Sequence, residues 1–151
     1  MKEEPRISNA FAMSIQVRWA DLDPNYHVRH SVYYDYGAYC RVSFLKQHGV
    51  DAAFFAEHHF GPILFREECV FRREIKLDDV VTIDLQLVKS RPDYSRWTIR
   101  HIITRNDQLA ATLTTEGAWI DIIKRKLTKP PQLAQASFEH MSKSTDFEWL
   151  K

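Results

Sequence analysis

The chain has 151 residues, of which 44% are hydrophobic and 27% are charged, and its formal net charge is +1. This length suits one domain with a hydrophobic core, and the low content of glycine (4) and proline (6) argues against a disordered chain. A net charge near zero gives no general attraction to nucleic acid or to a membrane surface. Since no apolar run approaches the ~18 residues of a membrane span, we expect no membrane span and no nucleic-acid partner.

The first residues and the cysteines bear on cellular location. Residues 1–11 include acidic side chains and lack the apolar core of a secretory signal. The two cysteines, Cys40 and Cys69, form neither a disulfide framework nor a metal motif. We therefore expect free thiols in a reducing compartment, and hence a cytoplasmic protein.

A strand and a polar loop are expected at the start of the domain. Residues 12–20 place Ile15, Val17 and Trp19 on one face, as in a half-buried strand. Residues 21–30 are polar, and Pro24 disfavours helical angles at Asp23. The sequence predicts a stiff loop that carries two aspartates, Asp21 and Asp23.

A helix over residues 31–48 should follow the loop. Ser31 is a candidate N-cap, and Gly49 is a typical stop. The apolar face is unusually broad, which predicts a helix wrapped by a sheet. It comprises Tyr33, Tyr36, Cys40 and Phe44, widened by Val32, Tyr39 and Leu45.

The remainder alternates with the period of β-strands. After a linker at 50–61, strands are expected over 63–73, 80–89, 95–105 and 109–123, with turns at 91–94 and 106–108. One long helix against five antiparallel strands is an α+β arrangement. We divide the chain into an N-terminal segment (1–11), the domain body (12–131) and a C-terminal helix and tail (132–151), with the last ten residues mobile.

A carboxylate that precedes a helix start can take part in attack on a carbonyl group. Asp23 precedes the expected helix start, where the backbone N–H groups of His30 and Ser31 lack partners within the helix. Such N–H groups stabilise the oxyanion formed when a carboxylate or an activated water attacks a carbonyl. The alternative for Asp23 is to cap a turn, and we expect Asp21 to hold the loop by hydrogen bonds.

These residues resemble the hotdog-fold acyl-CoA thioesterases of the 4-hydroxybenzoyl-CoA thioesterase type. The resemblance covers about residues 13–131 and is most specific in Trp19-Ala20-Asp21-x-Asp23, His27-Val28 and Tyr33. It implies a hotdog fold, in which a long central helix is wrapped by a five-stranded antiparallel sheet. Arg41 and the later strand segments also resemble the family.

The chain departs from the family pattern at two points. Tyr26 stands where the family has glycine, and Arg29-His30 replace a pair of asparagines. A side chain in a tight loop can alter backbone angles or narrow an entrance. These changes bear on substrate range and activity rather than on the fold.

The resemblance also implies roles for individual residues. Asp23 would be the nucleophile or the general base, with the His30 and Ser31 N–H groups as the oxyanion site. His27 and Tyr33 would contact substrate, although His27 could equally be structural. Some branches of the family place a catalytic glutamate on the long helix. The helix expected here contains Asp35 but no glutamate, which favours Asp23 as the catalytic residue. Arginines and lysines that are candidates for binding CoA phosphates are Arg66, Arg72, Arg73, Arg91, Arg96 and residues 124–126.

The histidines allow two other interpretations. Asp23, His27 and His30 could form a two-histidine, one-carboxylate metal site, but the geometry of a helix start opposes joint ligation, so no metal is expected. His58-His59-Phe60 faintly resembles hotdog dehydratases, whose histidine pairs with an acid on the long helix. That acid is missing here.

The expected function is hydrolysis of a medium-chain, long-chain or aryl acyl-CoA to free acid and CoA. No cofactor is expected, since CoA is part of the substrate. The resemblance implies a homodimer or homotetramer with sites at the interface. The alternatives are an acyl carrier protein thioesterase and a protein that binds acyl thioesters without hydrolysing them.

Overall fold

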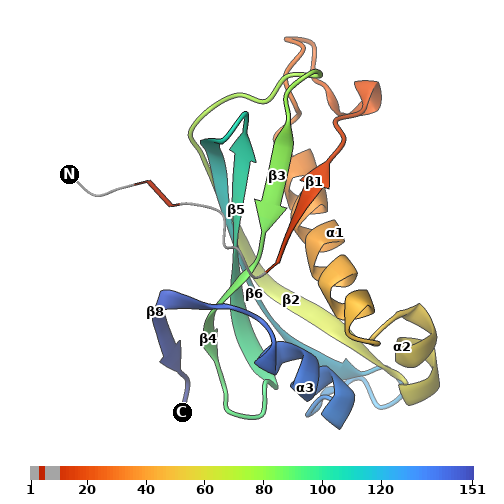
Figure 1. Cartoon of the computed structure of the whole chain (residues 1–151). Helices are drawn as coiled ribbons and strands as arrows, with labels where there is room; N and C mark the ends of the chain where they lie inside the picture. Colours follow the sequence, from red (N-terminus) through yellow and green to blue (C-terminus); the bar gives the residue numbers. More distant parts are fainter. Residues whose placement is uncertain (1–3, 6–10) are drawn as a thin grey trace.

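One long helix lies against the inner face of a curved sheet in the computed structural model, which describes residues 4–5 and 11–151 (Figure 1). Most of the predicted N-terminal segment 1–11 lies outside the described residues. The helices are α1 (Val32–Gln47), α2 (Ala52–His58) and α3 (Gln132–Glu139), with a 3-10 turn η1 (Trp19–Asp21). The strands are β1 (Ala12–Ile15), β2 (Phe60–Phe71), β3 (Val81–Asp84), β4 (Gln86–Ser90), β5 (Arg96–Arg105), β6 (Gln108–Asp121), β7 (Lys126–Leu127) and β8 (Lys143–Trp149).

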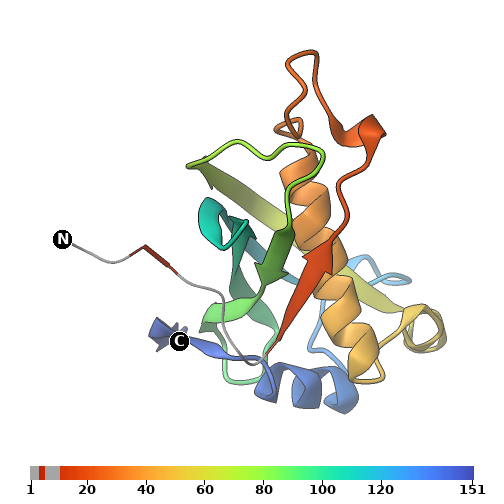
Figure 2. The ribbon, with the colours of Figure 1, turned by 45° about the horizontal axis from the view of Figure 1, so that its top comes forward.

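The sheet runs from β2 through β6 to β5, with β3 and β4 pairing along successive parts of β5. Beyond them, β1 pairs with β3 and β8 pairs with β4, and the short β7 pairs with β6. Every pairing is antiparallel except that of β4 with β8. The two views show the sheet curving around α1 (Figure 2). This arrangement confirms the predicted α+β hotdog fold, but the sheet of the described residues has eight strands rather than the predicted five, because one predicted strand is divided and β7 and β8 are added.

Helix α1 follows the prediction closely in its bounds and in most of its buried face. Of the seven expected apolar residues, all but Tyr39 are buried, and Tyr39 has 56% of its surface exposed. The C-terminus ends as predicted, because Gly49 adopts a φ of 87° and the Val50 N–H donates to Leu45 O. At the other end the prediction is wrong: the Ser31 hydroxyl caps no N–H group and instead accepts from Arg29 Nε at 3.2 Å.

The predicted strand 80–89 is interrupted at Leu85, which separates β3 from β4. The physical reason is a side-chain bond: the carboxylate Oδ1 of the buried Asp84 accepts the Ile102 N–H at 2.8 Å. A backbone N–H of β5 is thereby satisfied by a side chain rather than by a carbonyl of the neighbouring strand.

Two segments are more ordered than predicted, and a third forms as predicted. The expected linker contains α2, which Asp51 caps by accepting the Phe54 N–H at 2.9 Å. Helix α3 forms as expected and buries Ala134 and Phe138 in the core. The last ten residues are not a mobile tail, since β8 pairs in parallel with β4.

The first strand is shorter than predicted. β1 ends at Ile15, and although Val17 is buried, Trp19 belongs to η1 and is 69% exposed. The alternation of apolar residues therefore predicted too long a strand, because the chain leaves the sheet after Ile15 and enters the loop that carries Asp21 and Asp23. No helix in the described part of the chain is long and apolar enough to cross a membrane.

Candidate active site

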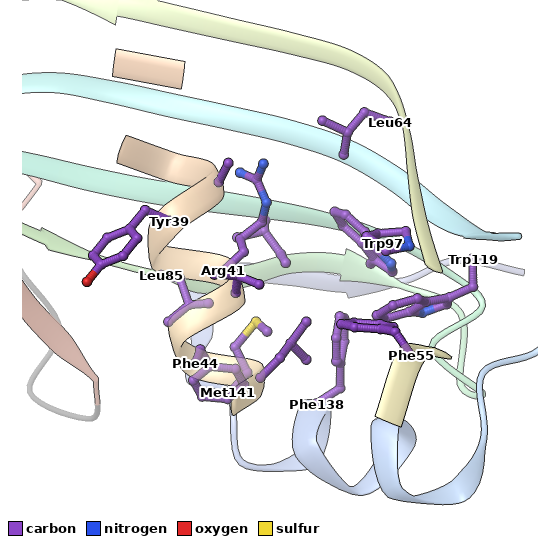
Figure 3. Close-up of a pocket in the computed structure, with 15 residues that line it drawn as sticks. Tyr39, Arg41, Phe44, Phe55, Leu64, Leu85, Trp97, Trp119, Phe138 and Met141 are labelled. Atoms are coloured by element: carbon purple, nitrogen blue, oxygen red, sulfur yellow. The ribbon is translucent and has the colours of Figure 1, made fainter. Parts of the chain in front are cut away.

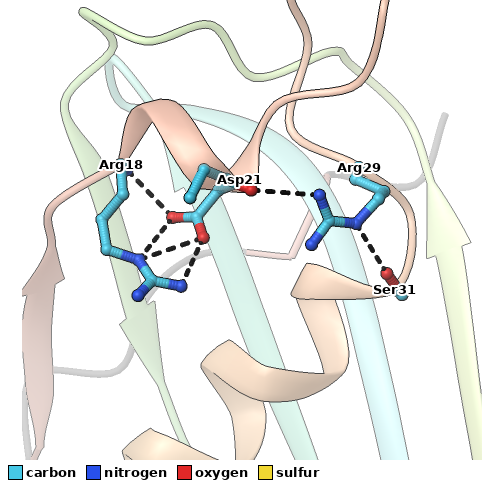
Figure 4. Close-up of polar contacts among 5 residues, drawn as sticks. Arg18, Asp21, Arg29 and Ser31 are labelled. Atoms are coloured by element: carbon cyan, nitrogen blue, oxygen red, sulfur yellow. Dashed lines mark hydrogen bonds and ion pairs between the residues drawn. The ribbon is translucent and has the colours of Figure 1, made fainter.

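The loop between β1 and α1 is anchored by Asp21 (Figure 4). Its buried carboxylate accepts from Arg18 Nη2 at 2.7 Å and from the Arg18 backbone N–H at 2.9 Å. Burial alone would raise the pKa of Asp21, but the hydrogen bonds and charge of Arg18 outweigh it and the pKa is lowered. The Arg29 N–H donates to the Asp21 carbonyl at 2.8 Å, which ties the two ends of the loop together. Asp21 therefore has the structural contacts that the sequence predicted.

Asp23 lies in the same loop, where its carboxylate closes a turn. Its Oδ1 accepts the backbone N–H groups of Asn25 at 2.9 Å and His27 at 3.2 Å. The Asp23 N–H donates to His27 O at 2.8 Å. These bonds fit the turn-capping alternative, and they also fix the carboxylate within the loop that precedes α1.

The start of α1 presents donors next to this loop. His30 and Ser31 are exposed, and their backbone N–H groups have no hydrogen-bond acceptor among residues 4–5 and 11–151. The following N–H, that of Val32, donates to Arg29 O at 2.9 Å and is already used. The two N–H groups singled out from the sequence are thus the ones that remain able to polarise a carbonyl oxygen.

The two residues predicted to contact substrate, His27 and Tyr33, make other contacts in the structure. The His27 ring points to Glu74, with Nε2 3.1 Å from Oε2, so it does not bond the Asp23 carboxylate. Tyr33 is buried and packs edge-to-face on Phe71, with ring centroids 4.9 Å apart. Burial raises the pKa of Tyr33 to about 12, helped by negative charges that include Glu74 and Asp23. Tyr33 is therefore a core residue that lies beside the loop.

A cavity of about 490 Å³ lies between the second half of α1 and the sheet (Figure 3). Its walls are almost entirely apolar and combine residues from α1, α2, the sheet and α3; they include Phe44, Phe55, Leu64, Trp97, Trp119 and Phe138. Sequence reasoning did not find this cavity, because its walls come from segments far apart in the chain. The only local signal was the aromatic content of those segments.

Within one chain, the cavity and the Asp23 loop do not meet. The α1 residues that line the cavity fall between Ala38 and Leu45, whereas Asp23 precedes the first turn at Val32. At 1.5 Å per residue, residues 32 and 41 are already about 14 Å apart along the helix axis. Figure 1 shows the loop at one end of α1 and helices α2 and α3 near the other.

A buried polar cluster crosses the centre of the molecule beside the cavity. Arg41 Nη1 lies 3.0 Å from His101 Nε2 and 3.2 Å from Thr115 Oγ1. Because arginine can only donate, His101 Nε2 accepts, and His101 Nδ1–H donates to Asp84 O at 2.8 Å. Burial, followed by the charge of Arg41, lowers the pKa of His101 to about 3, so this histidine is neutral.

Of the other predicted groups, Arg91 and Arg96 come together with Lys89 around one pocket. The described residues contain no group of three histidines, cysteines, aspartates or glutamates placed to hold a metal ion. His58 ends α2 and packs on Phe54, with ring centroids 4.1 Å apart. Among the arginines proposed for CoA phosphates, Arg66 pairs with Glu68 at 2.8 Å and Arg96 lies over the Phe65 ring.

The comparisons with known proteins agree with this architecture. Residues 17–138 match the model of the Thioesterase-like superfamily. Among curated proteins there is no significant match. The structural neighbours include a Staphylococcus aureus hypothetical protein in complex with CoA (20% identity, 99% of this chain and 94% of that one, TM-score 0.82). A 1,4-dihydroxy-2-naphthoyl-CoA thioesterase from Synechocystis is similar at 20% identity (84% and 93%, TM-score 0.76).

A third neighbour is a thioesterase from Thermus thermophilus in complex with coenzyme A and Zn (25% identity, 87% and 92%, TM-score 0.68). The family match covers the loop, α1, the main strands of the sheet and most of α3. The chain therefore belongs to the Thioesterase-like superfamily.

Proposed function

We propose that this protein is an acyl-CoA thioesterase, with Asp23 as nucleophile or general base. The observation that carries the proposal is a carboxylate fixed in the loop that leads into α1, together with two unused N–H groups at the start of that helix. Attack on a thioester carbonyl requires a base or nucleophile on one side and donors for the developing oxyanion on the other. The His30 and Ser31 N–H groups would supply those donors.

The apolar cavity would hold the acyl group. Its volume of about 490 Å³ and its aromatic walls suit a medium-chain, long-chain or aryl group better than acetyl. CoA as the carrier is supported by structural neighbours whose descriptions name coenzyme A. Acyl carrier protein remains the alternative carrier.

A homodimer would bring the cavity and Asp23 together. Among the described strands β2 pairs only with β6, so its other edge is open over a 12-residue strand with Leu64, Phe65, Val70 and Phe71 exposed. Long apolar edges favour pairing with another strand. A two-fold axis would make that pairing antiparallel and would place the Phe71 end of one β2 beside the Phe60 end of the other.

This pairing has a direct consequence for the site. The Asp23 loop contacts the chain just after β2 through His27 on Glu74, and Tyr33 in the first turn of α1 packs on Phe71 at the end of β2. The cavity reaches β2 near its start, at Pro62 and Leu64. An antiparallel dimer would therefore set Asp23 of one protomer near the cavity of its partner, and a tetramer could be built from two such dimers.

Free-thiol release tests the reaction. Acyl-CoAs from short to long chains, together with aryl esters, would be assayed with the wild type, Asp23→Asn and a control, Asp35→Asn, an exposed carboxylate in the first turn of α1. We expect the wild type to hydrolyse part of the panel, Asp23→Asn to lose at least about 10²-fold in kcat, and the control to keep its activity. Full activity in Asp23→Asn would contradict the assignment.

Intersubunit complementation tests the composite site. Ala38→Trp would fill the cavity from α1, and mixing it with Asp23→Asn would form hybrid dimers in which one site carries neither change. We expect activity to reappear on mixing two inactive proteins, with sedimentation confirming the dimer. A mixture that stays inactive while hybrids form would mean that each site lies within one protomer.

A binding-only role is the second candidate, and Tyr26 favours it. Tyr26 takes the left-handed φ of 65° and is exposed on the loop that carries Asp23. A bulky side chain there could restrict the approach of a thioester. Thermal stabilisation by an acyl-CoA that is recovered intact would support binding without turnover.

A further inference from the structure

The hairpin that joins β6 to β7 carries a further inference, which goes beyond the proposed function. Three aliphatic side chains at this turn face solvent: Ile123 is 67% exposed, Leu127 59% and Ile122 46%. Exposed aliphatic side chains that gather at one turn mark a contact surface, whereas ones scattered singly need no explanation. Residues 122–127 therefore form an apolar tip, which belongs neither to the Asp23 loop nor to the cavity lining.

The same tip is strongly basic. Lys124, Arg125 and Lys126 are all exposed, and none of them forms an ion pair with another of the described residues. With the single carboxylate of Asp121, the hairpin 121–127 has three cations against one anion, a net charge of +2, whereas the whole chain has +1. The near-neutral total thus conceals a local positive field at an apolar turn.

The backbone of the tip is already hydrogen-bonded, as a segment that enters a lipid interface requires. The Ile122 N–H donates to His59 O at 2.9 Å, just after α2. The Asp121 carboxylate Oδ1 accepts the N–H groups of Ile123 and Lys124 at 3.0 and 2.9 Å. The turn can therefore leave bulk water without exposing these N–H groups to an apolar medium.

The position and chemistry of the tip narrow the choice of partner. Ile120 and Asp121 pair with β2 on one edge of β6 and with β7 on the other, so β7 lies away from the edge proposed for the dimer. Two copies that met tip to tip would bring like charges together. A nucleic acid would use the cations but not the aliphatic side chains, because bases stack on aromatic rings. A stable protein interface covers about 800 Å² on each partner, which exceeds one short turn.

We propose that the β6–β7 hairpin docks on a bilayer that contains anionic lipids. Ile123 and Leu127 enter the boundary between headgroups and acyl chains, while residues 124–126 contact the headgroup phosphates. Lysine and arginine suit this place because their aliphatic stems lie along apolar surface and their charged ends reach the phosphates. Such binding combines buried apolar area with electrostatic attraction to anionic lipid.

Docking at this hairpin would bring the acyl cavity close to the lipid. Trp119, which lines the cavity, is separated from the hairpin only by Ile120, and Phe55 of α2 lines the cavity as well. A long acyl chain favours the bilayer, because each buried CH₂ contributes to partitioning. A docked protein would meet long-chain acyl-CoA where that ester accumulates. This consequence rests on the proposed function, whereas the docking itself does not.

Vesicle flotation tests the docking. The probes are vesicles of phosphatidylcholine alone and of phosphatidylcholine with about 30 mol% phosphatidylglycerol. We expect the wild type to bind the anionic vesicles at least about tenfold more tightly than the neutral ones, and the binding to weaken as salt is added. The absence of binding to anionic vesicles at low salt would overturn the proposal. Tighter binding to duplex DNA than to these vesicles would assign the tip to nucleic acid instead.

Two double variants separate the two parts of the tip. Lys124→Gln with Lys126→Gln should weaken binding to the anionic vesicles by about tenfold or more, since each basic residue contributes roughly fivefold. Ile123→Ser with Leu127→Ser should weaken it by about tenfold or more, because less apolar surface then enters the lipid. Binding that falls in the glutamine variant but is unchanged in the serine variant would overturn the insertion of the tip.

Lys76→Gln and Val80→Ser are the matched controls. Both residues are exposed and lie between β2 and β3, in the segment that bridges to His27 at the other end of α1 (Figure 1). We expect both controls to bind vesicles like the wild type. Sedimentation completes the test: a serine variant that loses vesicle binding and also changes its oligomeric state would make the tip an interface between copies and overturn the proposal. Flotation needs no substrate, so its outcome does not depend on whether the protein hydrolyses a thioester.

Discussion

The two polar regions of this protein differ in how their bonds are made. In the loop of residues 18–31, the side-chain carboxylates of Asp21 and Asp23 bond groups no more than four residues away. In the buried cluster, Arg41 contacts partners 60 and 74 residues away, His101 on β5 and Thr115 on β6. The loop is therefore specified by a short motif, whereas the cluster depends on the assembled sheet.

Replacing each aspartate separates two roles inside the loop, and this is the largest effect we expect. Asp23→Asn should lower kcat by at least about 10²-fold and leave the unfolding free energy nearly unchanged. Asp21→Ala should instead lower the unfolding free energy by about 1–3 kcal/mol, because buried hydrogen bonds to Arg18 are lost. Denaturant titration and thiol release measure both quantities. A stable but inactive Asp21→Ala protein would reverse the assignment.

Gly117→Ala should destabilise the sheet, on which the buried cluster depends. A Cβ at Gly117 would lie 2.5 Å from the Trp97 ring and 2.7 Å from the Ile63 carbonyl oxygen. Because the backbone cannot yield easily, we expect about 1–3 kcal/mol of destabilisation. Trp97 also lines the cavity, so KM for long acyl-CoAs should rise. Gly61→Ala, whose Cβ would be 3.7 Å from Ile122, is the matched control.

The same contrast explains what could be predicted from the sequence. The motif from Trp19 to Tyr33 and the alternation of β5 and β6 are local patterns, and they led to the fold and to the loop residues. The cavity and the cluster around Arg41 depend on segments far apart in the chain, including β5, β6 and α3. Packing of this kind leaves no periodic signal in the sequence.

Local patterns also failed where a tertiary contact replaced them. The alternation through residues 80–89 gave no sign that the Asp84 side chain would take the place of a carbonyl in the sheet. The tail was predicted to be mobile from its position alone, whereas its strand pairs with β4. In both cases a long-range bond decided the outcome.

We expect low pH to destabilise the folded protein through His101, which belongs to the buried polar cluster. Its folded-state pKa of about 3 lies below the ordinary value of 6.5, so between these values the unfolded chain binds more protons than the folded protein. Stability from this group is complete above about pH 6.5 and falls as the pH drops toward 3. The slope should approach about 1.4 kcal/mol per pH unit.

Denaturant titration from pH 7 to pH 4.5 measures that slope. His101→Gln should be less stable at pH 7, because Arg41 and Asp84 lose a well-placed partner. It should also show a shallower pH dependence than the wild type. An unchanged slope in His101→Gln would assign the acid sensitivity to other groups.

The smallest change in stability that we expect is that of Tyr26→Gly, in the loop. Tyr26 has a φ of 65°, which is unfavourable for a residue with a Cβ, and its ring contacts only the exposed Trp19 among the aromatic residues described. Glycine removes that strain but adds entropy to the unfolded chain, so a gain of up to about 1 kcal/mol is expected. Denaturant titration measures this gain, with Arg125→Gly, an exposed position at a φ of 56°, as the matched left-handed control. If Tyr26→Gly lowers stability while Arg125→Gly raises it, the Trp19–Tyr26 contact stabilises the loop by more than the backbone strain costs.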